Sequence, residues 1–368
     1  MSHRRNTAGL SRPAVLLFLA VTIIAGTALV LLIGLSPKAA AAANPYLTTD
    51  AFAPAWQIVG KQGGNLGEFQ QPRGITGMPD GSFVVVDRQA RVQHFAEDGK
   101  PLGVFSMKQH DLGNPKGLTA LPNGNLLIAD THYGRLLEMT VSGDIVKIWA
   151  QTGYKPGELV HPLSVAVDAG RNAAYVVTYG DYSDKVEKFS LDGTFIKQWG
   201  AFGSDPGQFQ RPSGVAVDSE GAVYVADSCN HRIQKFDPDG NFIKMWGEMG
   251  VAPGEMRYPY DIARGPGDLL YVVEFNNHRV SVFTKDGAFV KAIGGPGVRG
   301  GEFRCSWSLT VDQKGRLMVS DTANCRVQIL KLPPAAAMNV TLSAVKPPVT
   351  PNDTPAIQLS ERPVSEHR

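Results

Sequence analysis

Short apolar runs separated by glycine-containing turns recur along most of the chain. The runs are rich in Val, Ile and aromatic residues, which favours strands over helices. One pattern occurs six times. A loop ending in proline leads to a short apolar strand, a turn, and a second apolar strand ending in an acid. A further loop leads to a basic residue that opens a third strand, and a turn, in most repeats of the Asp-Gly type, leads to a fourth strand.

The six copies are in phase and differ little in length. The loop prolines are Pro72, Pro115, Pro162, Pro212 and Pro259, with Cys305 in the sixth place. The second strands end at Asp87, Asp130, Thr178, Asp227, Glu274 and Asp321. Four strands in about 40–50 residues is the size of a propeller blade. The pattern therefore predicts an all-β fold, a six-bladed β-propeller of four-stranded blades over residues 56–332.

The sixth repeat lacks a fourth strand, because Leu332, Pro333 and Pro334 follow its third strand and proline cannot continue a sheet. A run that resembles a fourth strand, WQIVG at residues 56–60, stands before the first repeat instead. We expect this N-terminal strand to complete the last blade and close the ring, which removes exposed sheet edges.

The repeats resemble the NHL-repeat family of six-bladed β-propellers. The segment VYVADSCNHRIQKFDPDGNFIKMWG (223–247) carries the resemblance best, followed by LYVVEFNNHRVSVFTKDG and LMVSDTANCRVQIL. One NHL-type propeller is the peptidyl-hydroxyglycine lyase, whose central zinc is held in part by histidines directly after the loop prolines. The residues at these places are Arg73, Lys116, Leu163, Ser213 and Tyr260, so the zinc ligands of the lyase do not carry over.

The N-terminal region has the pattern of a membrane segment. Residues 14–35 carry no charge, and a helix of that length spans a bilayer core of roughly 30 Å. Residues 1–13 are basic, which predicts a cytoplasmic N-terminus and a propeller in the periplasm or extracellular space. The alternative is a signal peptide cleaved before Asn44, which would release a secreted protein. Residues 36–55 are predicted to be a linker, and residues 333–368 a disordered tail.

Composition and charge narrow the functional classes. The chain has 368 residues, a formal net charge of +2 and 40 glycines, which suit many tight turns. Four basic residues precede the first acid, Asp50, so residues 50–368 carry a net charge of −2. That balance and the expected location argue against nucleic acid as a partner.

Each blade is predicted to place a basic group on the loop-rich face. The candidate binding rim consists of Arg73, Lys116, His161, Arg211, Arg257 and Arg304, with Tyr258 and Tyr260. One interpretation is a surface for an acidic peptide, protein or anionic glycan. The other is a solvated rim partly neutralised by nearby acids.

Three other sets of residues have mainly structural interpretations. We expect ion pairs that fix the loop between second and third strands at Asp87–Arg91, Asp130–Arg135, Asp227–Arg232, Glu274–Arg279 and Asp321–Arg326. The histidines His132, His161, His231 and His278 lack metal-ligand spacing, so no metal ligands and no cofactor are predicted. In an oxidising compartment, Cys305 and Cys325 are expected to form a disulfide, which leaves Cys229 free.

These observations favour a non-enzymatic binding or scaffolding module tethered to a membrane. No catalytic residues are assigned. The alternative is a metal-dependent lyase or lactonase-like hydrolase that uses zinc or calcium in the central funnel. RNA binding is a third function known for NHL propellers, and the predicted location disfavours it.

Overall fold

The computed structural model describes residues 56–107, 115–334 and 350. The predicted basic N-terminus, membrane segment and linker (residues 1–55) lie outside the described residues, as does most of the predicted tail. Within the described ranges, no helix is both long enough and apolar enough to span a membrane.

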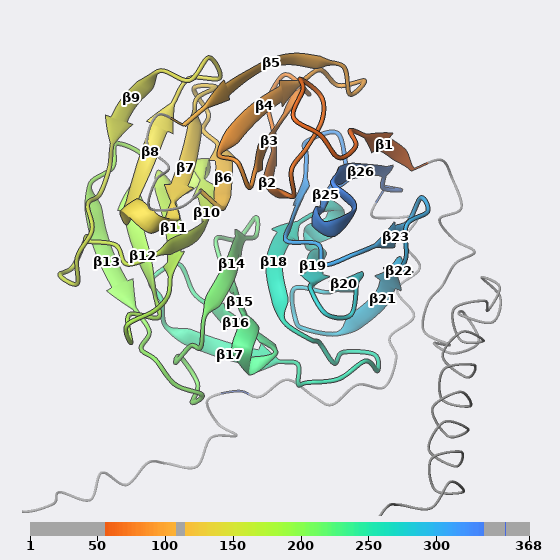
Figure 1. Cartoon of the computed structure of the whole chain (residues 1–368). Helices are drawn as coiled ribbons and strands as arrows, with labels where there is room; N and C mark the ends of the chain where they lie inside the picture. Colours follow the sequence, from red (N-terminus) through yellow and green to blue (C-terminus); the bar gives the residue numbers. More distant parts are fainter. Residues whose placement is uncertain (1–55, 108–114, 335–349, 351–368) are drawn as a thin grey trace, which may run out of the picture. The chain divides into compact units, whose positions relative to one another are not determined.

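Twenty-six strands and five short 3-10 helices make up the described fold (Figure 1). The strands are β1 (Gln57–Val59), β2 (Pro72–Gly77), β3 (Phe83–Asp87), β4 (Arg91–Phe95), β5 (Pro101–Ser106), β6 (Gly117–Ala120), β7 (Leu126–Asp130), β8 (Arg135–Met139), β9 (Ile145–Ile148), β10 (Pro162–Asp168), β11 (Ala173–Thr178), β12 (Lys185–Ser190), β13 (Phe195–Trp199), β14 (Pro212–Val217), β15 (Val223–Asp227), β16 (Arg232–Phe236), β17 (Phe242–Trp246), β18 (Pro259–Arg264), β19 (Leu270–Glu274), β20 (Arg279–Phe283), β21 (Phe289–Ile293), β22 (Gly295–Pro296), β23 (Glu302–Phe303), β24 (Ser308–Val311), β25 (Arg316–Asp321) and β26 (Arg326–Lys331). The 3-10 helices are η1 (Thr131–Tyr133), η2 (Ala169–Arg171), η3 (Ser228–Asn230), η4 (Pro266–Asp268) and η5 (Thr322–Asn324).

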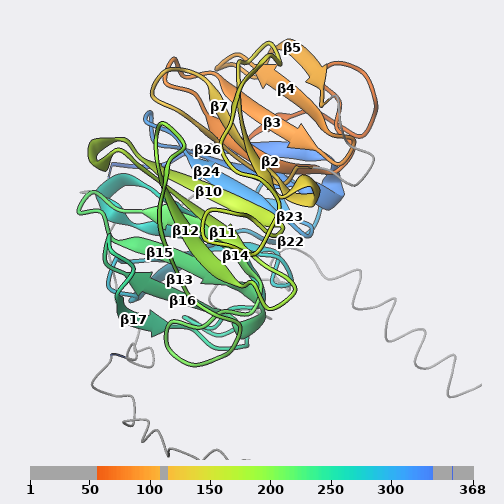
Figure 2. The same ribbon diagram turned by 90° about the vertical axis from the view of Figure 1, so that its left-hand side faces the viewer.

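Six antiparallel four-stranded sheets form the blades of a propeller, as the repeat pattern predicts. Blade 1 is β2–β5, blade 2 is β6–β9, blade 3 is β10–β13, blade 4 is β14–β17, blade 5 is β18–β21, and blade 6 is β24–β26 together with β1. The first strand of each blade contacts the first strand of the next blade around the axis, and β24 contacts β2 to complete the circle. Figures 1 and 2 show the sheets arranged around this axis.

The N-terminal strand closes the ring, which confirms the predicted closure. β1 pairs antiparallel with β26, so that Gln57 lies opposite Ile329 and Val59 opposite Val327. A buried apolar cluster continues across the junction, where Phe69 and Phe83 of the first repeat pack with Met318 of blade 6 and its neighbours. Similar clusters join other adjacent blades, so burial between sheets holds the ring together.

Candidate functional site

In four of the six blades, a β-bulge near the start of the innermost strand leaves one residue out of the ladder. In blade 4, Pro212 pairs with Asp227 and Gly214 pairs with Ala226, so Ser213 is left out of the ladder. The same register shift occurs in blades 1, 3 and 5. Bulges redirect side chains, and the equivalent residues of all six blades line one pocket. They are Arg73, Lys116, Leu163, Ser213, Tyr260 and Trp307.

The strand pairing observed in blade 6 shifts its alignment with the other repeats by one residue relative to the alignment predicted from the sequence. Ser308 pairs with Ser320, and Asp321 ends the second strand, so Ser306 takes the place of the loop proline. Cys305 instead corresponds to the residue before proline and has a left-handed φ of 48°, like Arg211 with 54° and Tyr258 with 51°. The prediction that Cys305 takes the place of the loop proline is therefore wrong by one residue, and Trp307 was not among the predicted rim residues.

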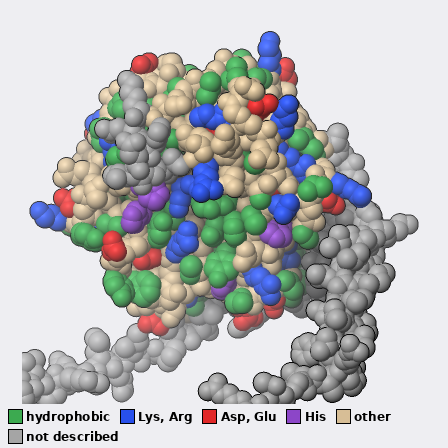
Figure 3. Space-filling model, viewed as in Figure 1, with side chains coloured by type: hydrophobic (Ala, Val, Ile, Leu, Met, Phe, Trp, Pro, Cys, Tyr) green, Lys and Arg blue, Asp and Glu red, His purple; other side chains and the backbone are tan. Residues whose placement is uncertain are grey.

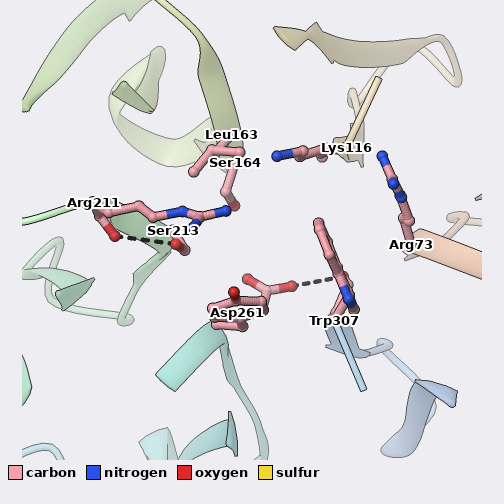
Figure 4. A pocket seen from close by; sticks show the side chains of 11 residues that line it. Arg73, Lys116, Leu163, Ser164, Arg211, Ser213, Asp261 and Trp307 are labelled. Carbon is pink, nitrogen blue, oxygen red and sulfur yellow. Dashed lines mark hydrogen bonds between the residues drawn. The ribbon is translucent and has the colours of Figure 1, made fainter. Parts of the chain in front are cut away.

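Three cations from three blades converge in this pocket. Arg73, Lys116 and Arg211 are half-buried, and Figure 4 shows their side chains pointing toward the middle of the channel. Within the described residues, none of the three forms an ion pair, and the Nε atoms of both arginines are buried without a hydrogen-bond partner. On the space-filled surface, Lys and Arg side chains gather near the middle of this face beside hydrophobic ones (Figure 3).

Aromatic rings surround the cations. The guanidinium carbon of Arg73 lies 4.7 Å from the ring centre of Trp307, and Lys116 Nζ lies 5.2 Å from the same ring. The ring of Tyr179 also contacts two cations: its centre lies 5.5 Å from Lys116 Nζ and 5.2 Å from the guanidinium carbon of Arg211. The rings hold the cations in place without neutralising them.

The electrostatics of the pocket favour an incoming anion. Burial, followed by the charges of Arg211 and Arg73, lowers the pKa of Lys116 to about 7. Burial also lowers the pKa of Arg73, with the charge of Arg88 as the next cause. The pocket opens to solvent, and its cavity volume is about 30 Å³. A negative group placed there would offset charges that burial and mutual repulsion disfavour.

One acid, Asp261, also lines the pocket. Its Oδ2 accepts hydrogen bonds from Ser308 Oγ at 2.6 Å and from the amide of Leu309 at 3.2 Å (Figure 4). Burial raises its pKa to about 7, against the lowering effect of these hydrogen bonds. Asp261 therefore joins blades 5 and 6 and does not form an ion pair with the pocket cations.

The other members of the predicted rim lie outside this pocket. Arg257 and Arg304 are exposed and do not line it. Tyr258 packs against His231, with ring centres 4.6 Å apart. His161 sits beside the pocket, with its ring 5.3 Å from that of Tyr179. Of the eight predicted rim residues, the structure brings together only Arg73, Lys116, Arg211 and Tyr260.

His231 and His278 occupy the same position in successive repeats, and each accepts an equivalent hydrogen bond. His231 Nδ1 accepts a hydrogen bond from the amide of Tyr258 at 3.1 Å, and His278 Nδ1 accepts one from the amide of Cys305 at 3.1 Å. Each histidine thus supports the left-handed residue of the following blade.

The described ranges contain no group of three His, Cys, Asp or Glu residues that could hold a metal ion. Asp261 stands alone among three cations, so the pocket does not fit zinc or calcium.

The predicted Cys305–Cys325 disulfide is not formed, because Cys229, Cys305 and Cys325 are all free. The repeat geometry gives the reason. Cys305 is held by His278 of the preceding blade, and Cys325 occupies the position in blade 6 that His278 holds in blade 5. The blade that follows Cys325 around the ring is blade 1, whereas Cys305 precedes the first strand of blade 6.

The predicted acid–base pairs all form and secure the loops beside the pocket. The distances are 2.5 Å for Asp87–Arg91, 2.8 Å for Asp130–Arg135, 2.8 Å for Asp227–Arg232, 2.8 Å for Glu274–Arg279 and 2.7 Å for Asp321–Arg326. Arg232 also donates to the carbonyl oxygens of Ser204, Asp205 and Gln208. In blade 3, which has no such pair, Lys185 binds Glu187 at 2.7 Å.

Comparison with known proteins agrees with the fold and the repeats. The family model described as NHL repeat matches residues 209–236 and 256–283, which lie in blades 4 and 5. The chain is therefore a six-bladed β-propeller that carries NHL repeats. No curated protein matches its sequence.

Several solved structures share the fold at low sequence identity. A streptogramin B lyase is 14% identical with a TM-score of 0.55, over 76% of this chain and 100% of that one. The virginiamycin B lyase from Staphylococcus aureus is 13% identical with a TM-score of 0.52, over the same shares. A protein of unknown function from Bacteroides thetaiotaomicron is 14% identical with a TM-score of 0.57, over 75% of this chain and 76% of that one. At such identities the similarity shows the fold alone.

Proposed function

We propose that this propeller is a non-enzymatic binding module that takes a carboxylate-bearing peptide, protein or glycan group into its central pocket. The observation that carries the proposal is the convergence of Arg73, Lys116 and Arg211, from three blades, without a carboxylate partner among the described residues. Natural proteins rarely bury cations unpaired.

The arrangement suits recognition of a carboxylate. The guanidinium groups of Arg73 and Arg211 supply planar donors that can bind a carboxylate in a bidentate way. Trp307, Tyr179 and Tyr260 offer apolar surface to the rest of the ligand.

The alternative function, a metal-dependent lyase or hydrolase, has less support. Two of the solved structures named above are lyases, but at their level of identity the likeness concerns the fold. The donor set of the pocket is cationic, and its one acid is engaged by Ser308. Binding requires no chemistry beyond what these side chains provide.

We further propose that the module is tethered to a membrane, with the propeller outside the cytoplasm. The basic residues 1–13 and the uncharged run 14–35 support this topology. A reporter enzyme that is active only outside the cytoplasm, fused after residue 368, tests it. Activity supports the topology, and a reporter active only in the cytoplasm contradicts it.

Calorimetry with peptides tests the binding function. The full-length chain, solubilised in a neutral detergent, is titrated with a glutamate-rich peptide and with a lysine-rich peptide of equal length. We expect binding of the acidic peptide alone, weakened by salt because the interaction is between charges. Equal binding of both peptides, or of neither at low salt, would contradict the proposal.

A further inference from the structure

We propose that Lys116 reversibly captures the carbonyl carbon of a 2-oxo carboxylate as an imine, while Arg73 and Arg211 hold the carboxylate. This inference rests on the proposed function, because it names the ligand class of the same pocket. The geometry that carries it is a lysine amine in a small aromatic pocket, with a guanidinium group on either side (Figure 4).

The amine of Lys116 is available to react. Its Nζ atom has no hydrogen-bond or ion-pair partner in the described part of the chain, and its neighbours are the rings of Tyr179 and Trp307. A lysine that is desolvated and adjacent to other cations loses its proton readily, and the neutral amine is a nucleophile. With a pKa of about 7, roughly half of the Lys116 amines are neutral at pH 7, against roughly one in a few thousand for an ordinary lysine.

Two other lysines lie over aromatic rings, but unlike Lys116 their amines are hydrogen-bonded. Lys188 and Lys235 also lie over aromatic rings, at 5.5 Å from Tyr175 and 5.3 Å from Tyr224. Their Nζ atoms, however, donate to the carbonyl oxygens of Pro238 at 2.8 Å and Lys285 at 3.2 Å. An aromatic neighbour alone therefore does not leave an amine unbonded.

The reaction is balanced without an oxidant or a metal. The nitrogen of Lys116 attacks the carbonyl carbon, a C–N bond forms, and the carbonyl oxygen leaves as water with two protons from the amine. Asp261 lines the same pocket, and its pKa of about 7 lets its carboxyl group carry a proton near neutral pH. The guanidinium groups favour a ligand whose carboxylate adjoins its carbonyl, which a 2-oxo acid provides.

Reductive trapping tests the proposal directly. The full-length chain in neutral detergent is incubated with glyoxylate and cyanoborohydride at pH 7, digested, and analysed by mass spectrometry. We expect labelling at Lys116 to exceed that at Lys188 and Lys235 by roughly a hundredfold, because the Nζ atoms of those two lysines donate to backbone carbonyl oxygens and their amines are not free to attack. Lys291, whose pKa burial lowers to about 8, is the matched control for an amine with a lowered pKa away from the pocket. Labelling of Lys291 equal to that of Lys116 would overturn the proposal.

The role of the arginines is tested by comparing glyoxylate with acetaldehyde, which has a carbonyl but no carboxylate. In Arg73→Gln/Arg211→Gln, the ratio of glyoxylate to acetaldehyde labelling at Lys116 should fall roughly tenfold or more, since hydrogen bonds to a charged partner are lost. Because any change in the pKa of Lys116 affects both reagents, the ratio isolates the carboxylate contact. An unchanged ratio would overturn this assignment.

Failure of the imine and failure of the proposed function are distinguishable. Lys116→Arg has no primary amine and cannot form an imine, so it should lose the glyoxylate adduct, while the two functions are compared on the native chain. A native chain that binds the acidic peptide and yields no Lys116 adduct overturns the imine alone. A chain that yields the adduct but does not bind the peptide overturns the peptide ligand alone.

Discussion

Lys116 Nζ lies 5.2 Å from the ring centre of Trp307, although the two residues belong to blades 2 and 6. Arg73 of the intervening blade 1 approaches the same indole to 4.7 Å. One side chain of the closing blade thus positions cations from two other blades. The ring closure and the binding pocket are therefore physically connected.

Replacing Trp307 should weaken ligand binding without unfolding the propeller. In Trp307→Leu both cation–π contacts are lost, at about 0.5–2 kcal/mol each. We expect the dissociation constant for the acidic peptide to rise roughly tenfold, measured by calorimetry, because Arg73 and Lys116 lose their orientation. A variant that melts like the native chain and binds with unchanged affinity would show that Trp307 does not organise the pocket.

Binding of a carboxylate should strengthen as the pH falls through 7. Lys116, with a pKa of about 7, gains its charge over this interval, and an anion favours the charged form. Asp261, also near 7, loses its charge over the same interval and acts in the same direction. Burial lowers the pKa of His132, the nearby histidine that would otherwise begin to gain charge at the lower end of this interval. We expect an affinity roughly tenfold or more higher at pH 6 than at pH 8.5.

Variants of Lys116 and Asp261 distinguish how much each residue contributes to the pH dependence of binding. Lys116→Arg should flatten most of the dependence, and Lys116→Arg/Asp261→Asn should remove it within this interval. Calorimetry at several pH values, in buffers of matched ionic strength, provides the measurement. A double variant that keeps the full native pH dependence would place the titrating group outside the pocket.

Asp261 should make the fold less stable as the pH rises. Its pKa is near 4 in an unfolded chain and about 7 in the fold. Between these values the unfolded chain has released the proton while the folded chain retains it, so the free energy of unfolding falls with pH. Below about pH 4 the effect is absent, and above about pH 7 it is complete, on the order of 4 kcal/mol.

Asp261→Asn isolates that effect, because the amide does not ionise. Relative to the native chain, the variant should gain stability between pH 4 and pH 7 and show a constant difference above. Urea unfolding followed by fluorescence at each pH measures the difference. A difference that does not change with pH would mean that the carboxyl ionises normally in the fold.

The buried ion pair of blade 4 should contribute far more to stability than an exposed one. Asp227 lies 2.8 Å from Arg232, and both side chains are nearly inaccessible to solvent. Asp227→Asn leaves the guanidinium without its charged partner, which should lower the free energy of unfolding by about 3–5 kcal/mol. Glu220→Gln breaks the exposed pair with Lys285 and is the matched control. It should leave the melting temperature almost unchanged, and equal effects of both variants would contradict the burial argument.

The sequence predicted the architecture because each blade repeats the same local rules. Strand alternation, Asp-Gly turns and the displaced strand WQIVG were sufficient to derive six blades and their closure by β1 and β26. The ion pairs, such as Asp227–Arg232, followed from their fixed places in the repeat. Such features depend on neighbours within one blade or in the adjoining blade.

The pocket was harder to predict because it depends on register and on distant blades. The sequence placed Cys305 where Ser306 lies, and this shift of one residue hid Trp307 from the set of residues that follow the loop prolines. Tyr179 follows the second strand of blade 3 directly, and only the arrangement of the ring brings it to Arg211. Arg257 and Arg304 are exposed to solvent, whereas the pocket cations are half-buried. The sequence alone does not predict this difference in solvent exposure.

The most direct test of the account compares two pairs of arginines. Arg73→Gln/Arg211→Gln removes guanidinium groups from the pocket, and Arg257→Gln/Arg304→Gln removes equal charge from the exposed rim. By calorimetry with the acidic peptide, we expect the pocket variant to lose roughly a hundredfold in affinity, since two charge-assisted contacts are lost, and the rim variant to change little. Equal losses in the two variants would show that the peptide binds through general surface charge and not in the central pocket.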